Sequence, residues 1–537
     1  MKRLKIIYTP LLLANFLSAV FLLSSCTKSD TLTEIPRGFL SPDNAFLNKE
    51  GFISALGDLY RLGRGLRTRD LFSGEGDKII SAVYGSGTDV GYYWDKKLNF
   101  GDYKLINSTN ELAVNYWNIL FDLVKGSNTI ITRLKTSNLS NTTKAPIEAE
   151  ARFFRAYAYR FLVYLYGDVP KIAEELTEPK FDFVRTPKNE ILDFMIEDLE
   201  FASQNLPVTN PGDGHLCKAA ADHILAETYI SEGKFDKAID AASRIINDGQ
   251  YQLMNHRFGS YANRPGDLFW DMFRLGNQNR SAGNTESILV WQMEFGTPGG
   301  DANYSAERSW GPYLDPLKDS DGKAAIVQAD SLGRPVSFVI PTEYLNVDIW
   351  QNDPNDIRNS VYNMQRTFYN NNPASKEFGK AIPKPSVANR NYHVWVKKAS
   401  CPEGHPQGYD ANGRLYTDIY CIRLAETYLL RAEAYLGKGD NVAAAADINV
   451  VRNRANATPV LPAAVNIDYI LDERARELVV EEPRRLTLAR LGLLYARVKK
   501  YNPVSAASIQ PFNNLLPIPQ NTIDVNTGAK FAQNTGY

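Results

Sequence analysis

Two segments that lie far apart in the chain share one spacing of alanine, glutamate, tyrosine and glycine. The first runs from Leu225 to about Asn247, and the second runs from Arg431 to about Arg454. The matching positions are Ala226/Ala432, Glu227/Glu433, Tyr229/Tyr435, Gly233/Gly439 and Ala238/Ala444. Small residues at these spacings let two antiparallel helices approach closely. The chain is therefore expected to contain at least two similar helical hairpins.

This spacing is the tetratricopeptide pattern, in which helical hairpins stack on their neighbours. Two distant units do not make a regular solenoid, so they are expected to meet across an insertion. Apolar residues at helical spacing predict further helices in both regions. The expected helices cover about 108–134, 147–166, 420–437, 441–455, 467–481 and 484–499, and the last stretch, 515–537, is expected to be an irregular tail.

The insertion covers roughly residues 255–415 and is richer in Gly, Asn, Pro and Asp. Short strand-like runs such as Ser287–Trp291 and Tyr392–Lys397 interrupt it. It is interpreted as loops and small sheets on a helical scaffold, where binding sites tend to lie. The predicted fold is mainly α. An N-terminal helical region at 26–254 and a C-terminal one at 416–537 would form one compact domain, 26–537, with the insertion as its ligand face.

The N-terminus indicates export. Lys2, Arg3 and Lys5 precede an apolar run that ends in Leu23-Ser24-Ser25-Cys26. This pattern is typical of a secretory signal peptide, predicted at 1–25, and the run is short for a membrane span. The tetrad resembles the bacterial lipobox, so Cys26 is predicted to be lipidated and to hold the protein at a membrane. An ordinary cysteine near a cleavage site is the alternative.

Composition argues against several classes of function. The chain has a formal charge of −1, and cleavage would remove three basic residues and leave a mildly acidic protein. Such a protein lacks the basic surface that is typical of nucleic-acid binding. Beyond Cys26, only Cys217, Cys401 and Cys421 remain, and at least one of three must be free or paired outside the chain. The five histidines show no metal-ligand spacing, so no metal and no cofactor are predicted.

Four groups of residues carry a resemblance to a known family. They are Ser41–Phe46; Arg155–Tyr157 with Tyr166–Pro170; Arg423–Glu426 and Arg431–Ala434 with Ile448–Arg454; and Ile470–Glu477 with Leu515–Gln520 and Gln533–Tyr537. In this order, and together with the lipobox, they resemble the SusD/RagB family of outer-membrane nutrient-binding lipoproteins over nearly the whole chain. One departure is Glu481–Leu486, where the family usually has Glu-Gly-His or similar, then Arg and an aromatic, so an altered helix junction is expected there.

The resemblance implies a binding protein and no enzyme. Such a protein would be lipid-anchored in the outer membrane, would face the exterior, and would pass a glycan or peptide to a SusC-like TonB-dependent barrel. A glycoside hydrolase is one alternative, but it needs two carboxylates across a sugar cleft, and no nucleophile or metal motif supports it. A tetratricopeptide scaffold that binds only proteins is another. Glu473, Arg474, Arg476 and Glu477 are interpreted as a salt-bridged helix face.

Aromatic residues outside the predicted core are the candidates for ligand binding. Sugars pack their C–H faces on aromatic rings, and their hydroxyls need nearby polar partners. Trp94 and Trp310 are predicted to be stacking platforms, with Tyr92 and Tyr313 flanking them. The resemblance supports these two regions, because starch-binding members of the family use aromatics from corresponding stretches. The alternative is that these rings pin loops to the body of the protein.

Overall fold

The computed structural model describes residues 45–72, 75–95, 101–300, 303–328, 333–405, 413 and 415–537. Contacts divide the chain into two compact units, Met1–Phe52 and Ile53–Tyr537. In the described part of the first unit, the rings of Phe46 and Phe52 lie 5.0 Å apart. The predicted signal peptide, Cys26 and Ser41–Asn44, the start of the first resembling group, lie outside the described residues.

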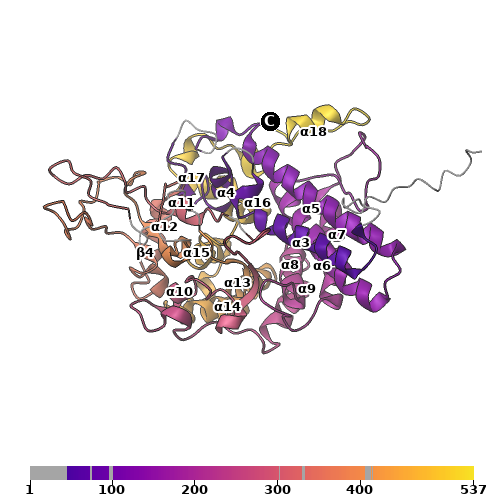
Figure 1. Ribbon diagram of the computed structural model, residues 1–537, viewed down its shortest axis with the longest axis horizontal. Coiled ribbons are helices and arrows are strands. Elements are labelled where there is room, and N and C mark those ends of the chain that lie inside the picture. The colour runs from indigo at the N-terminus through magenta and orange to yellow at the C-terminus, as the bar shows by residue number, and fades with distance from the viewer. Residues whose placement is uncertain are drawn as a thin grey trace, which may run out of the picture. The chain divides into compact units, whose positions relative to one another are not determined.

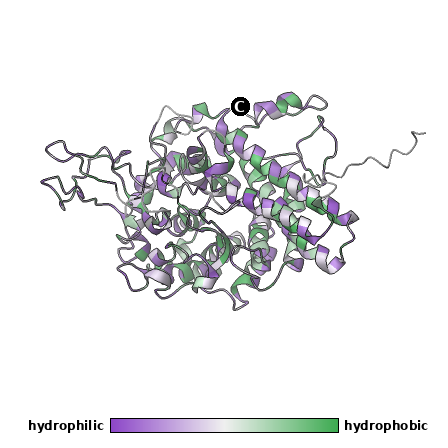
Figure 2. Cartoon of the chain, in the orientation of Figure 1, coloured by the Kyte–Doolittle hydropathy of each residue, from purple (hydrophilic) through white to green (hydrophobic). Residues whose placement is uncertain are grey.

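The N-terminal region forms a row of helices, each packed on the next. They are α5 (Glu111–Thr136), α6 (Asn141–Tyr166), α7 (Lys188–Asn205), α8 (Lys218–Ser231) and α9 (Phe235–Ile246), which lie side by side in Figure 1. Figure 2 shows both green and purple residues on these helices, as expected for helices that bury one face. Asn110 caps α5 and Ser140 caps α6, because each side chain accepts a hydrogen bond from the first turn.

The C-terminal helices complete the same scaffold. They are α13 (Leu424–Gly437), α14 (Asn441–Arg454), α15 (Ile467–Leu478), α16 (Arg484–Arg490) and α17 (Leu494–Tyr501). Helix α13 packs on α8 and α9 as well as on α14 and α15, and α16 packs on α6. A mainly α scaffold with hairpins from distant parts of the chain is therefore confirmed. Its C-terminal core contains Ala425, Leu429, Ala432, Ala444, Ile448, Val451, Ile470 and Leu478.

The residues shared by the two repeated segments have matching roles. Gly233 and Gly439 lie at the turns of the α8–α9 and α13–α14 hairpins with φ of +70° and +79°, a conformation that favours glycine. Glu227 binds the Arg160 guanidinium through two hydrogen bonds of 2.6 and 2.7 Å. Its counterpart Glu433 likewise accepts two hydrogen bonds from one arginine of α16, one on each carboxylate oxygen. The repeat thus encodes both the turn and a buried ion pair.

The remaining elements are short, apart from α3 (Lys49–Gly65) and α4 (Gly76–Tyr84). Three two-stranded antiparallel sheets are formed by β1 (Gly91–Tyr92) with β3 (Ile340–Pro341), β2 (Ser287–Trp291) with β6 (Ile419–Arg423), and β4 (Met364–Gln365) with β5 (Trp395–Val396). Short helices include α10 (Leu268–Asp271), α11 (Ala306–Trp310) and α12 (Glu343–Asn346). The pairing of β2 with β6 joins the insertion to the start of α13.

Several expected boundaries were wrong. The helix expected from about residue 420 begins only at Leu424, because the preceding residues form β6. The helix expected at 484–499 is two helices, α16 and α17, and Gly492 between them has φ of +68°. The tail after Leu515 contains a short helix, α18 (Gln520–Val525). None of the helices in the described ranges is both long enough and apolar enough to cross a bilayer.

Candidate functional site

Pairing of β1 with β3 fixes the aromatic segment Tyr92–Trp94. Tyr92 lies opposite Ile340 in the sheet, and side chains of an extended segment alternate between its two sides. Tyr93 is fully buried and stacks on Phe338, with the ring centroids 6.5 Å apart. Its neighbours Tyr92 and Trp94 stay half-buried. The sheet therefore anchors Tyr93 and leaves part of the two flanking rings accessible.

Trp94 and Tyr313 meet at Arg390. The guanidinium carbon of Arg390 lies 4.0 Å from the centroid of Trp94 and 4.7 Å from that of Tyr313. Two hydrogen bonds hold this arrangement: the Tyr313 amide donates to the Arg390 carbonyl at 2.9 Å, and Arg390 Nε donates to the Val336 carbonyl at 3.2 Å. We call Trp94, Tyr313 and Arg390 the Trp94 cluster. Arg390 was not singled out in the sequence, because nothing in its local pattern indicated two aromatic partners.

The Trp94 cluster combines ring faces with fixed hydrogen-bond donors. Burial lowers the pKa of the Arg390 guanidinium, and nearby Tyr313, Tyr93 and Asp95 oppose that change. An arginine stays protonated throughout the physiological range, so the cluster presents a positive planar group between aromatic surfaces. Such a surface suits the C–H face and hydroxyls of a sugar. All three side chains are half-buried, so each retains accessible area.

Tyr92 has a different neighbour. Burial raises the pKa of its phenol, and the carboxylate of Glu343 adds to that increase. Glu343 begins α12 and does not belong to the Trp94 cluster. The structure thus brings two of the four predicted residues together through Arg390 and places Tyr92 beside α12.

Trp310 cannot act as a stacking platform in this conformation. It ends α11 and is only 1% exposed. Helix α11 packs on α4, and the indole lies against the backbone at Gly85, where an added Cβ would come within 2.6 Å of the ring atom Cη2 and closer still to Cζ2. The open ring face expected at Trp310 is absent because the ring fills this contact. Trp310 supports the loop that leads to Tyr313.

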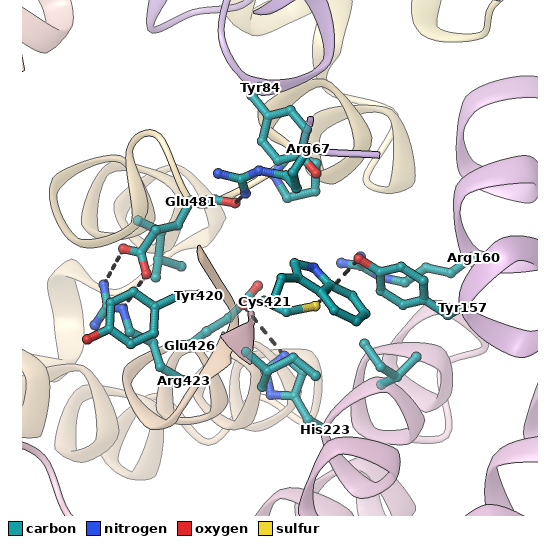
Figure 3. Close-up of a pocket in the computed structure, with 15 residues that line it drawn as sticks. Arg67, Tyr84, Tyr157, Arg160, His223, Tyr420, Cys421, Arg423, Glu426 and Glu481 are labelled. Atoms are coloured by element: carbon teal, nitrogen blue, oxygen red, sulfur yellow. Dashed lines mark hydrogen bonds and ion pairs between the residues drawn. The ribbon is translucent and has the colours of Figure 1, made fainter. Parts of the chain in front are cut away.

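A small polar cavity lies deep in the scaffold (Figure 3). Arg67, Arg160, His223, Glu426 and Glu481 are among its lining residues. Its volume of about 20 Å³ has room for roughly one water molecule and is too small for a sugar. Figure 3 shows that its charged side chains bind one another, as in the pair of Glu481 with Arg423. This cavity is therefore a small gap in the core and not a ligand site.

The carboxylates on α15 belong to a buried ion network. Glu473 and Glu477 both accept hydrogen bonds from Arg358 Nη1, at 2.8 and 2.9 Å, and all three side chains are fully buried. Burial alone would raise the pKa of Glu473, but Arg358, Arg476 and Arg452 outweigh burial and lower it to about 2. A general acid of a glycosidase needs a raised pKa. The ion-paired interpretation is confirmed, although the pairs are buried and mostly join different elements.

Within the described ranges, no group of three or more His, Cys, Asp and Glu side chains could hold a metal ion. The thiols of Cys217, Cys401 and Cys421 are free. Cys421 lies on β6 and not in a helix, and its thiol is 3.5 Å from the Tyr157 hydroxyl.

Comparison with known proteins settles the family. The SusD family model matches residues 342–537, and a second model, described as "Starch-binding associating with outer membrane", matches residues 84–230. Together these segments take in more than half of the chain and include helices α5 to α7, nearly all of α8, and α13 to α17. The chain belongs to the SusD/RagB family. Trp94 and Arg390 lie in the matched segments, whereas Tyr313 lies between them.

Relatives and solved structures agree with this membership. SusD-like protein P25 from Formosa agariphila is 24% identical, over 97% of this chain and 99% of its own. The starch-binding protein SusD from Bacteroides thetaiotaomicron is 38% identical over 22% of each chain. A laminarin-binding SusD-like protein superposes with a TM-score of 0.68 at 21% identity, covering 91% of this chain and all of its own.

A surface glycan-binding protein A from Bacteroides thetaiotaomicron, solved with laminarihexaose, superposes with a TM-score of 0.67 at 19% identity. It matches over 90% of this chain and 99% of its own. At these identities the superpositions show the shared SusD-like fold. The fold of this SusD/RagB member is therefore mainly α, with a loop-rich insertion and short strands.

Proposed function

We propose that this SusD/RagB protein binds a glycan through the Trp94 cluster and delivers it to a SusC-like TonB-dependent barrel. It does so as a lipoprotein anchored at Cys26 in the outer membrane and facing the exterior. The observation that carries the proposal is the pair of half-buried rings on one guanidinium, described above for Trp94, Arg390 and Tyr313. The helical regions within 53–254 and 416–537 supply the scaffold, and the insertion 255–415 supplies most of the ligand face.

The known relatives indicate which glycans to test first. One similar protein is named for starch binding, one structure is named for laminarin binding, and another contains laminarihexaose. These ligands are glucans without charge. Sugar rings of this type can stack on Trp94 and Tyr313 while their hydroxyls accept hydrogen bonds from Arg390. In this proposal, Tyr92 is a flanking contact for longer glycan chains. The buried Trp310 supports the loop that leads to Tyr313 and does not contact the glycan.

Calorimetric titration tests the ligand class. The mature protein without its lipid should bind laminarihexaose or a starch fragment, and Trp94→Ala should weaken that binding about tenfold, because a stacking ring contributes roughly 1 kcal/mol or slightly more. Tyr313→Ala should act in the same direction. Tyr369→Ala is the matched control, since Tyr369 is an aromatic residue of the same insertion that is 58% exposed outside the cluster.

Three outcomes would contradict the proposal. One is tight binding of peptides with no glycan bound. Another is unchanged glycan affinity in Trp94→Ala. The third is release of reducing ends from the glycan, which would show hydrolysis and favour an enzyme.

The partner and the anchor need experiments in cells. Affinity purification from solubilised outer membranes should recover a large barrel with the protein. Cys26→Ala should abolish acyl labelling and release the protein from the membrane fraction. A Cys26→Ala variant that stays lipidated, or repeated recovery of the protein alone, would refute these parts of the proposal separately.

A further inference from the structure

A second pocket lies on the C-terminal half of the scaffold. It has a volume of about 510 Å³ and is lined by Tyr344, Ala464, Tyr469, Asp472, Arg476 and Tyr501, among others. These residues come from α12, α15, α17 and a short 3-10 helix, Pro462–Ala464. None of the lining residues belongs to the Trp94 cluster. The volume lies in the range of small-molecule binding sites.

One side of this pocket is a rigid pair of tyrosines. The ring centroids of Tyr344 and Tyr501 lie 4.2 Å apart, and Tyr344 is only 2% exposed. The Tyr344 hydroxyl donates to Asp472 at 2.5 Å and accepts from Arg497 at 2.6 Å. Arg497 also donates to Asp472 at 2.8 Å. This network fixes an aromatic surface next to a carboxylate that is partly exposed.

A third ring, Tyr469, also lines the pocket and lies near two guanidinium groups. Tyr469 is half-buried, with the guanidinium carbon of Arg452 5.7 Å and that of Arg476 5.9 Å from its centroid. Arg476 is held by two further contacts: Nε donates to the Ile349 carbonyl at 2.8 Å, and Nη1 donates to Glu473 at 2.9 Å. The guanidinium of Arg476 is therefore positioned before any ligand arrives.

The charges around the pocket are largely matched within the protein. Arg452 binds both oxygens of Asp353, at 2.8 and 2.9 Å. Asp472 is paired with Arg497, and Arg476 with Glu473. A charged ligand would have to compete with these pairs. A neutral ligand with many hydroxyls can use the same polar atoms as donors and acceptors and can lay its C–H faces on the tyrosines.

We propose that this pocket is a second binding site for a neutral sugar, with Tyr469 as the stacking ring and Asp472 and Arg476 as hydroxyl partners. This proposal does not depend on ligand binding at the Trp94 cluster. It assigns the protein two sites that share no residue, so that a long glycan can be held at two points.

The pocket can be blocked from an exposed position. Ala464 is an exposed lining residue, and Ala464→Trp would fill the pocket without disturbing the core. Ala463→Trp is the matched control, because Ala463 is the preceding exposed residue in the same turn and does not line the pocket. Tyr469→Ala removes the proposed stacking ring as a second, independent variant.

Ligand-observed NMR with glucose and laminaribiose tests the site in a Trp94→Ala/Tyr313→Ala background. Binding should persist in this background, should fall at least tenfold when Ala464→Trp or Tyr469→Ala is added, and should stay unchanged with Ala463→Trp. Glucuronic acid should bind more weakly than glucose. The proposal is overturned if no neutral sugar binds in that background, if blocking the pocket changes nothing, or if glucuronic acid binds best. Loss of affinity in Trp94→Ala alone tests the Trp94 cluster and not this pocket.

Discussion

The contact between Gly85 and Trp310 gives a stability prediction that does not depend on the ligand. Gly85 has φ of −177°, outside the left-handed region, so a positive φ does not demand glycine here. The neighbouring indole does, because an added Cβ would come within 2.6 Å of Cη2, whereas ordinary carbon contacts are about 3.5–4.0 Å. In Gly85→Ala the ring must move by roughly 1 Å inside a packed core.

Such overpacking costs about 1–3 kcal/mol, so Gly85→Ala should lower the free energy of unfolding by that amount. Trp310→Phe removes the ring atoms that meet the new Cβ and should itself cost on the order of 2 kcal/mol. Adding Gly85→Ala to Trp310→Phe should then cost little. Urea unfolding followed by circular dichroism measures all four proteins of this double-mutant cycle.

Gly57→Ala is the matched control. Gly57 lies inside α3, and an added Cβ there meets nothing within 4 Å. Alanine should therefore stabilise the protein by about 0.5–1 kcal/mol through its helix propensity. The reasoning fails if Gly85→Ala costs the same in the wild-type protein and in the Trp310→Phe variant, because the indole would then not be the cause.

Three further predictions follow from the buried side chains. Because Glu473 has a folded pKa of about 2 against 4.5 in the unfolded chain, its ion pairs stabilise the protein fully above pH 4.5, and stability should fall as the pH drops from 4.5 towards 2. Urea midpoints across this range check the sign, and constant stability down to pH 2 would contradict it. Glu227→Gln should cost about 3–5 kcal/mol in urea unfolding, since Arg160 is left buried without its counter-charge, and a cost below about 1 kcal/mol would refute this. Trp310→Ala should lower the free energy of unfolding by about 3–5 kcal/mol, because this ring is buried, whereas Trp94→Ala should change it by less than about 1 kcal/mol. Thermal unfolding measures both variants, and equal losses of stability would contradict the difference in burial between the two rings.

The helical scaffold could be predicted because its signals are local. Gly233 and Gly439 mark the turns of two hairpins, and the alanines around them allow close helix packing. Their meeting across the insertion followed from the repeat, since each hairpin needs a neighbour to cover its apolar face. The prediction of one helix at 484–499 was wrong because Gly492, with φ of +68°, separates α16 from α17.

The candidate site could be predicted only in part, because it depends on contacts between distant residues. Trp94 and Tyr313 were found from aromatic residues in loops, but Arg390 joins them from a third segment with no local sign of that role. Trp310 was misjudged because its glycine-rich surroundings suggested exposure. Part of its burial comes from a close contact with Gly85, which lies far away in the sequence. The second pocket likewise needs tyrosines from three separate elements.

The buried Arg358 of the insertion has a consequence for which parts of this protein can change during evolution. Arg358 fastens the insertion to α15 through fully buried carboxylates, whereas Tyr313 and Arg390 stand on loops outside that network. The residues that attach the insertion to α15 therefore differ from the residues of the Trp94 cluster. Under the proposed function, substitutions in the loops that carry Tyr313 and Arg390 can change the ligand contacts while the Arg358 ion pairs keep the insertion in place. Under the same proposal, a change of ligand specificity in these loops need not lower the stability that the buried ion pairs provide.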